Sequence, residues 1–205
     1  MKNLSVILLF LVVSFASCKT NDPDFEYTYN TNPRYTWGYA EFFGAYYKDY
    51  ENSNNVISLS LFSDSLFIDD EGNLDGTGQY LFIEDLFIAS TDTILPEGVY
   101  SASKSGDPFT FYPGESFGVD EMKYTIGAYI YYIEKNSAFS TIKFIDRGSF
   151  TVSNIGSKQN ITCNFVLSDS TVLNGMFNAQ LPHIDQSATT PSNAPRKKPA
   201  LKYPF

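Results

Sequence analysis

The sequence has few cysteines, few basic residues and no apolar run long enough for a membrane-spanning helix. It has two cysteines, Cys18 and Cys163, so the chain can form one internal disulfide at most. Its longest apolar run, residues 4–13, is shorter than the roughly 20 residues of a membrane-spanning helix. Basic residues are outnumbered, with 14 Lys and Arg against 23 Asp and Glu and a net charge of −9. Because an acidic chain repels phosphate backbones, nucleic acid is not expected as a partner.

The first 18 residues have the layout of an export signal. Lys2 gives the positive start, the apolar run 4–13 follows, and the small residues Ala16 and Ser17 precede Cys18. This order is typical of a secretory signal peptide with its cleavage site. One interpretation is therefore a plain signal peptide that carries a cysteine at the cut.

A more specific interpretation rests on the residues Phe15-Ala16-Ser17-Cys18, which resemble the lipobox of bacterial lipoproteins. Together with the acidic stretch 21–26 and the tyrosine-rich body, they make the chain similar to small cell-surface lipoproteins of the Bacteroidota type. The resemblance implies that residues 1–17 are removed and that Cys18 carries a diacylglyceryl group and an acyl chain such as palmitate. It also implies a lipid anchor in the outer membrane or at the cell surface.

An acylated Cys18 cannot form a disulfide, which leaves Cys163 as a free thiol. The sequence around Cys163 alternates between polar and apolar residues, so its side chain is expected to point inward from a strand. A buried free cysteine acts as a small hydrophobic residue.

Composition divides the chain into four parts. Residues 1–17 are the signal peptide, 18–33 a flexible acidic lead, 34–184 an all-β domain, and 185–205 a disordered tail rich in proline and basic residues. The all-β part is long enough to enclose one hydrophobic core.

Strand signals recur along the domain, whereas no stretch shows convincing helical periodicity. Clusters of Gly, Asn, Asp, Ser and Pro separate segments in which apolar residues alternate with polar ones or run together. The pattern predicts a single antiparallel β-sandwich or flattened β-barrel of about 8–10 strands. The expected strands are 35–47, 56–62, 79–89, 98–103, 109–111, 124–134, 140–146, 149–153, 160–167 and 172–181.

One motif matches a catalytic pattern. Gly114-Glu115-Ser116-Phe117-Gly118 has the spacing of a G-x-S-x-G nucleophile elbow, and Asp146 or Asp169 and then His183 follow in hydrolase order. The elbow needs a helix after the serine, but a strand-like segment follows here. The only histidine, His183, lies beside the tail, where an oriented base is not expected. A β-turn explains the motif, and no enzyme activity is predicted.

Two acidic stretches are candidate sites, one for a catalytic carboxylate pair and one for calcium. Glu84 and Asp85 interrupt an apolar strand, and adjacent strand residues face one cleft only if the strand carries a bulge. Residues 69–76 space their acids like a calcium loop but lack the glycine and glutamate of an EF-hand. A hairpin loop is the default there, and an irregular calcium site is the alternative. No cofactor or metal is predicted.

Tyr35, Trp37, Tyr39 and Phe43 fall on one face of the first expected strand, with Glu41 among them. A core face is one interpretation, because aromatic strand residues are usually buried. The other is a sugar-binding platform in which Tyr35, Trp37 and Tyr39 stack on a glycan and Glu41 accepts a hydroxyl.

Three triplets resemble the O-glycosylation acceptor pattern of exported Bacteroidota-type proteins. They place Ser65, Thr93 and Ser170 directly after an aspartate. Ordinary turn chemistry also explains them.

The sequence therefore predicts a non-catalytic, lipid-anchored module that binds a glycan or a partner protein. The alternative is a lipocalin-like carrier of a small apolar ligand, and a hydrolase using Ser116 comes third. An open apolar interior would favour the carrier, whereas a filled core with an aromatic surface would favour the binding module.

The anchor can be tested by intact mass spectrometry of the membrane-extracted protein. The mass should equal residues 18–205 plus a diacylglyceryl group and an acyl chain, and Cys18→Ala should abolish both additions. Extra hexose-sized steps would report modification at Ser65, Thr93 or Ser170. An unmodified chain released into the medium would contradict the anchor.

Overall fold

The computed structural model describes residues 30–63, 65–119, 122–134, 140–188 and 200–201. Its regular structure is β-strand apart from one 3-10 helix, η2 (Lys48–Tyr50), which confirms the predicted all-β class. No helix in these residues is long and apolar enough to cross a membrane. The strands are β1 (Arg34–Gly44), β2 (Asn55–Ser63), β3 (Leu66–Ile68), β4 (Asn73–Gly76), β5 (Gly78–Ile88), β6 (Gly98–Ala102), β7 (Thr110–Phe111), β8 (Glu115–Val119), β9 (Met122–Ile126), β10 (Ala128–Ile133), β11 (Ser140–Ile155), β12 (Lys158–Leu167), β13 (Val172–Leu173), β14 (Met176–Ala179), β15 (His183–Asp185) and β16 (Ala200–Leu201).

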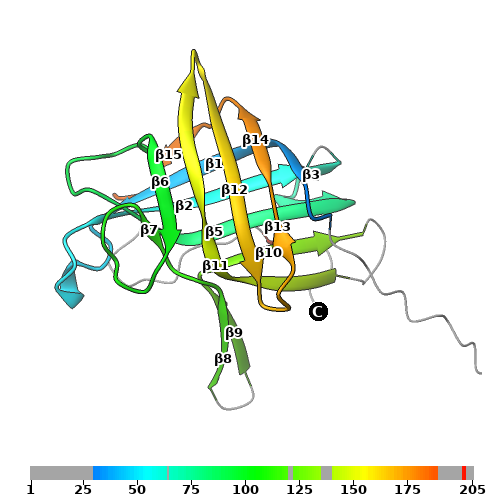
Figure 1. The fold of residues 1–205 in the computed structure, drawn as a ribbon, viewed down its shortest axis with the longest axis horizontal. Coiled ribbons are helices and arrows are strands. Elements are labelled where there is room, and N and C mark those ends of the chain that lie inside the picture. Colours follow the sequence, from blue (N-terminus) through cyan, green and yellow to red (C-terminus); the bar gives the residue numbers. More distant parts are fainter. Residues whose placement is uncertain (1–29, 64, 120–121, 135–139, 189–199, 202–205) are drawn as a thin grey trace, which may run out of the picture.

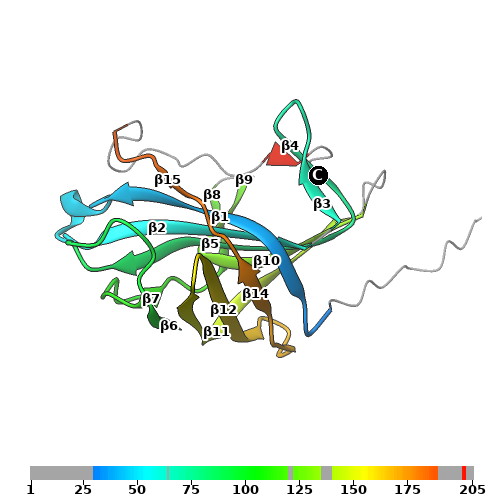
Figure 2. The same cartoon turned by 90° about the horizontal axis from the view of Figure 1, so that it is seen from above.

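Two groups of long strands form two layers. β1, β2 and β5 pair side by side in one layer, and β11 pairs with β12 in the other. Figure 2 shows the layers one above the other, and Figure 1 shows that their strands cross at a steep angle. On one side of the molecule, β5 is joined to β11 through β10 and also through the pair β6–β7. On the other side, β14 pairs with both β12 and β1 and so joins the two layers. The pairings therefore close on themselves and produce a flattened barrel.

The main sheet is mixed rather than antiparallel throughout. β14 and β15 both run parallel to β1 and come from one continuous segment of chain. The antiparallel pairing of β14 with β12 sets the direction of this segment, and that direction makes it parallel to β1. The strand expected at 172–181 is divided into β13 and β14, with irregular backbone between them and after β14.

Other strand boundaries also depart from the expected ones. The strand expected at 124–134 breaks at Gly127, whose φ of 75° is a left-handed conformation that favours glycine. A hairpin, β8–β9, projects from the barrel before this break (Figure 1). A second hairpin, β3–β4, contains the hairpin loop expected at 69–76, although its two short strands were not predicted. β16 pairs with β4 inside the tail that was expected to be disordered.

The barrel interior is filled with large side chains. Tyr100 from β6 stacks on Phe150 with ring centres 4.8 Å apart, and Phe111 meets the edge of Phe165 at 5.8 Å. Phe177 of β14 is fully buried in the same cluster. Cys163 points inward, as its alternation predicted, and burial raises the pKa of its thiol.

Because β14 closes the barrel, its inward residue should be critical for stability. Phe177→Ala should lower the free energy of unfolding by about 3–5 kcal/mol, since it leaves a cavity between β12 and β1. The neighbouring Asn178 is exposed, so Asn178→Ala should change stability by no more than about 0.5 kcal/mol. Urea titration measures both values, and equal losses for the two variants would contradict the described closure.

Candidate functional site

The aromatic strip expected on the first strand is split between two faces. Tyr35 pairs with Ser63, whereas Trp37 pairs with Phe62, so β1 has an extra residue at this point. The irregularity changes the side-chain alternation, because two residues of β1 then oppose one of β2. Tyr35 consequently lies in the interior core, and its buried hydroxyl has no hydrogen-bond partner among the residues that the structure describes. The prediction that Tyr35 shares a face with Trp37 and Tyr39 is wrong.

Trp37 and Tyr39 belong to a second cluster on the outer face of the β1–β2–β5 layer. The Trp37 indole stacks on Phe62 with ring centres 3.9 Å apart and donates a hydrogen bond of 2.8 Å to the Leu66 carbonyl of β3. Tyr39 hydrogen-bonds to Ser60, and burial raises the pKa of its phenol. Half-buried rings held in this way support the β3–β4 hairpin rather than an open sugar platform.

Glu41 also has neighbours within the protein. Its carboxylate accepts hydrogen bonds from Ser58 (3.4 Å) and from the side-chain amide of Gln186 (3.2 Å). The Gln186 backbone N–H in turn donates to the Phe42 carbonyl, so these contacts hold the end of β15 against β1. The structure thus brings Glu41 near Tyr39 but gives both a role in packing.

β5 contains the bulge that the Glu84-Asp85 pair requires. Ile57 pairs with Leu86 and Leu59 with Ile83, so the single residue between them on β2 opposes both acids. The Glu84 carboxylate accepts the Gly127 N–H at 3.2 Å, and the Gly127 carbonyl accepts the Glu84 N–H at 3.2 Å. Glu84 therefore fixes the break where β9 passes into β10.

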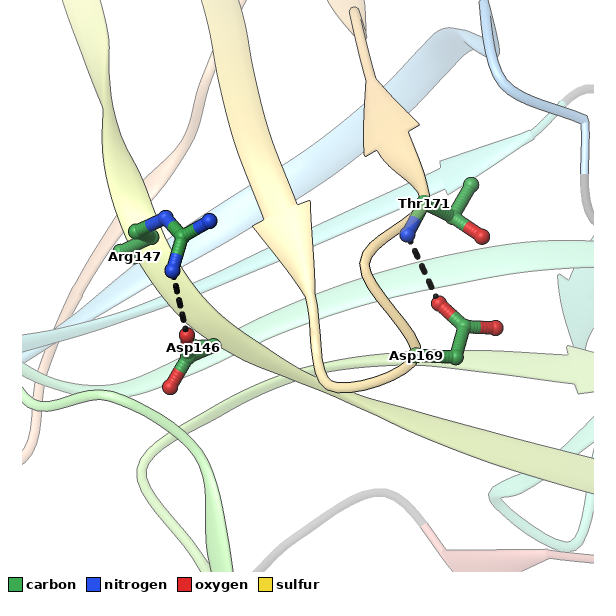
Figure 3. A network of polar contacts seen from close by, with 4 residues as sticks. All are labelled: Asp146, Arg147, Asp169 and Thr171. Carbon is green, nitrogen blue, oxygen red and sulfur yellow. Dashed lines mark hydrogen bonds and ion pairs between the residues drawn. The ribbon is translucent and has the colours of Figure 1, made fainter.

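The residues of the hydrolase motif belong to separate parts of the molecule. Ser116 lies on β8, which pairs with β9 in the projecting hairpin. The β-turn expected for the motif is therefore wrong, and the strand conformation is also not the strained turn of a nucleophile elbow. Figure 3 shows Asp146 beside Arg147, with 3.4 Å between the charged groups, and Asp169 accepting the Thr171 N–H at 3.0 Å. Lys143 also approaches Asp169 to 2.8 Å and lowers the pKa of its carboxyl to about 2.

His183 joins β15 to the loop after β5. Its Nε2 accepts the Leu95 N–H at 3.1 Å, and the ring also hydrogen-bonds to the backbone of Leu181. Burial lowers the pKa of the imidazole, an effect that the Leu181 contact partly opposes. Because Nε2 is an acceptor, the neutral ring suits this position. His183 lines a groove of about 390 Å³ together with Ile94 and Lys158.

The acidic loop between β3 and β4 uses its first carboxylate to shape a turn. Asp69 Oδ1 accepts the backbone N–H groups of Glu71 (3.0 Å) and Asn73 (2.8 Å). The Asp69 N–H also donates to the Asn73 carbonyl, which closes the loop. Among the described residues, no group of three or more His, Cys, Asp and Glu has a metal-binding arrangement.

The remaining predicted modification sites lie at the surface or outside the described part of the chain. Ser65, Thr93 and Ser170 are exposed, and Ser170 has a left-handed φ of 71° in the turn after β12. Cys18 lies outside the described residues.

A different cleft gathers aromatic and polar side chains at one end of the barrel. Its lining residues come mainly from the loop that joins β1 to β2 and the loop that joins β6 to β7. Both loops lie on the left of Figure 1. Its volume is about 400 Å³, within the range of small-molecule sites. The lining residues are Tyr47, Tyr50, Glu51, Asn52, Ser53, Asn54, Ser105, Gly106, Asp107 and Tyr112.

Hydrogen bonds fix the two loops of this cleft to each other. The side-chain amides of Asn52 and Asn54 both donate to the Gly106 carbonyl, at 3.0 and 2.9 Å. Asn52 Oδ1 also accepts the Asn54 N–H at 2.9 Å. Gly106 has a φ of 72°, and this left-handed turn presents its carbonyl to both amides.

Asp85 of the β5 bulge holds two of the three cleft tyrosines. Its carboxylate accepts the Tyr47 hydroxyl at 2.9 Å, and its backbone carbonyl accepts the Tyr112 N–H at 3.0 Å. Burial, and secondarily the Asp85 charge, raises the pKa of Tyr112. Tyr50 is the outermost ring, 69% exposed, with its centre 6.4 Å from that of Tyr47.

Sequence reasoning missed this cleft because its walls are more than fifty positions apart in the chain. The sequence Tyr-Tyr-Lys-Asp-Tyr-Glu-Asn-Ser-Asn at 46–54 was the available signal. It combines a high density of tyrosine with the amides and hydroxyls of a turn. The predicted strand 35–47 instead placed Tyr47 in a strand rather than in the loop that lines the cleft.

Comparison with known proteins gives no relative for this chain: no protein-family model, curated protein or solved structure matches it.

The burial of His183 can be tested by measuring the pKa of its imidazole. The folded imidazole should titrate below its ordinary pKa of about 6.5, because burial disfavours the charged ring. The neutral His183 ring then contributes its full stabilisation above about pH 6.5, the pKa of the unfolded state. This stabilisation is lost as the pH falls through the lower pKa of the folded state. NMR can follow the single imidazole of the chain without ambiguity.

The control is His183→Gln, whose amide oxygen can still accept the Leu95 N–H. This variant should lose less thermal stability than the wild type in the same acidic window. An NMR midpoint at or above the ordinary value would contradict the assignment.

Proposed function

We propose that the protein is a non-catalytic glycan-binding module, and that a lipid on Cys18 holds it at the outer membrane or cell surface. The observation that carries the proposal is the cleft between the β1–β2 and β6–β7 loops. Three tyrosine rings stand there beside carboxylates and side-chain amides.

Each part of the cleft suits one property of a sugar. Tyrosine rings pack against the apolar C–H faces of a pyranose, and Tyr50 is exposed enough to be covered by one. Glu51 and Asp107 offer carboxylate oxygens to sugar hydroxyls, which form strong charge-assisted hydrogen bonds. The loops are already tied together through Gly106, so binding requires little ordering.

The packed interior supports a surface site over the carrier alternative. The central positions hold Phe111, Phe150 and Phe165, all essentially buried and in mutual ring contact. A lipocalin-like carrier needs interior space for its ligand, whereas these rings occupy the centre of the barrel. The proposal includes no catalytic step, because Ser116 and His183 lie on separate elements.

The proposal is tested by screening neutral oligosaccharides and measuring the affinity of any that bind by calorimetry. Tyr50→Ala should weaken binding about tenfold or more, because an exposed aromatic ring is the main stacking surface. Fold stability should change little, since the ring is 69% exposed. Tyr124→Ala, which removes an exposed tyrosine of the β8–β9 hairpin, is the matched control and should bind normally.

Two results would refute this site. One is the absence of binding to every glycan tested, and the other is binding that Tyr50→Ala leaves unchanged.

A further inference from the structure

The charged residues that line the cleft are of one sign. Glu51 and Asp107 are the charged residues among the described positions that line it, and both are acidic. Asp85 adds a third carboxylate behind the Tyr47 hydroxyl. Two lysines, Lys48 of η2 and Lys104, are close to the cleft in the chain but are not among the lining residues. Lys104 is engaged in an ion pair with Glu115 at 2.6 Å.

Aromatic rings strengthen the same preference. The faces of Tyr47, Tyr50 and Tyr112 carry partial negative charge, which attracts an ammonium group placed over them. A cation in the cleft would therefore meet ring faces and carboxylates together. A ligand carboxylate or sulfate would instead face like charges in a chain whose net charge is −9.

We propose that the cleft selects glycans that carry a free amino group, of the unacetylated hexosamine class, over neutral glycans, and excludes uronic acids. The proposal rests on the proposed glycan-binding function and adds the identity of the preferred sugar. Neutral sugars retain the ring stacking and the hydroxyl contacts. An amino sugar adds its ammonium group, and a uronate adds an unfavourable carboxylate.

Three β-1,4-linked tetrasaccharides of gluco configuration provide matched probes. They are cellotetraose, the glucosamine tetramer and the glucuronic acid tetramer, which differ in charge but share their linkage. Calorimetry on the full chain at about pH 6, where the sugar amine is protonated, compares their dissociation constants. The glucosamine tetramer should bind on the order of tenfold more tightly than cellotetraose, and the glucuronate should bind most weakly.

Charge-neutral variants identify the source of the preference. Glu51→Gln and Asp107→Asn preserve size and hydrogen-bonding oxygens, and the hydrogen bonds of Asp107 to Ser105 and Thr110 use its backbone. Each variant should reduce the advantage of the amino sugar several-fold with little change for cellotetraose. Asp70→Asn, an equal change of charge on the exposed β3–β4 loop, should leave the ratio unchanged. Raising the salt concentration should also reduce the ratio.

The outcomes separate this inference from the function beneath it. If cellotetraose or another neutral glycan binds through Tyr50 but the amino sugar has no advantage, the charge selection is overturned and the glycan site stands. A preference that survives both Glu51→Gln and Asp107→Asn also overturns it. If no glycan binds at all, the proposed function itself fails.

Discussion

The hydrogen bond from Tyr47 to Asp85 ties the candidate site to the barrel, and it exists because β5 contains a bulge. Without the extra residue, Glu84 and Asp85 would point to opposite faces of the layer, as neighbours on a regular strand do. With it, Glu84 fixes the turn at Gly127, while Asp85 positions Tyr47 through its side chain and Tyr112 through its backbone. A single backbone irregularity thus shapes both the projecting hairpin and the cleft.

The flattened barrel leaves little room for function inside it. Aromatic rings from β6, β7, β11 and β12 meet in its centre, and short strands close both sides between the two layers. The proposed recognition site therefore lies on the loops at the barrel end, where Asn52 and Asn54 both donate hydrogen bonds to the Gly106 carbonyl of the opposite loop. Binding residues are commonly carried by loops that a rigid scaffold positions.

Alternating and continuous apolar patterns in the sequence were sufficient to predict the all-β class and most of the long strands, because strands such as β12 bury one face and strands such as β2 and β5 bury both. These patterns could not locate the irregularity between Tyr35 and Trp37, where one extra residue sends neighbouring aromatic side chains into different cores. Parallel pairing of β14 with β1 also has no local signal, because it depends on how β12 directs the segment. The cleft was missed for a related reason: Tyr50 and Asp107 meet only after the barrel brings their loops together.

The most direct test of this account is an NMR titration of the full chain with a neutral tetrasaccharide that binds it. The amide signals of 47–54 and 105–112 should shift together, while the indole N–H of Trp37, the only tryptophan, should stay in place. That result would locate the ligand in the loop cleft at the barrel end. A shift of the Trp37 indole with unmoved cleft amides would place recognition on the outer face of β1 and contradict the account.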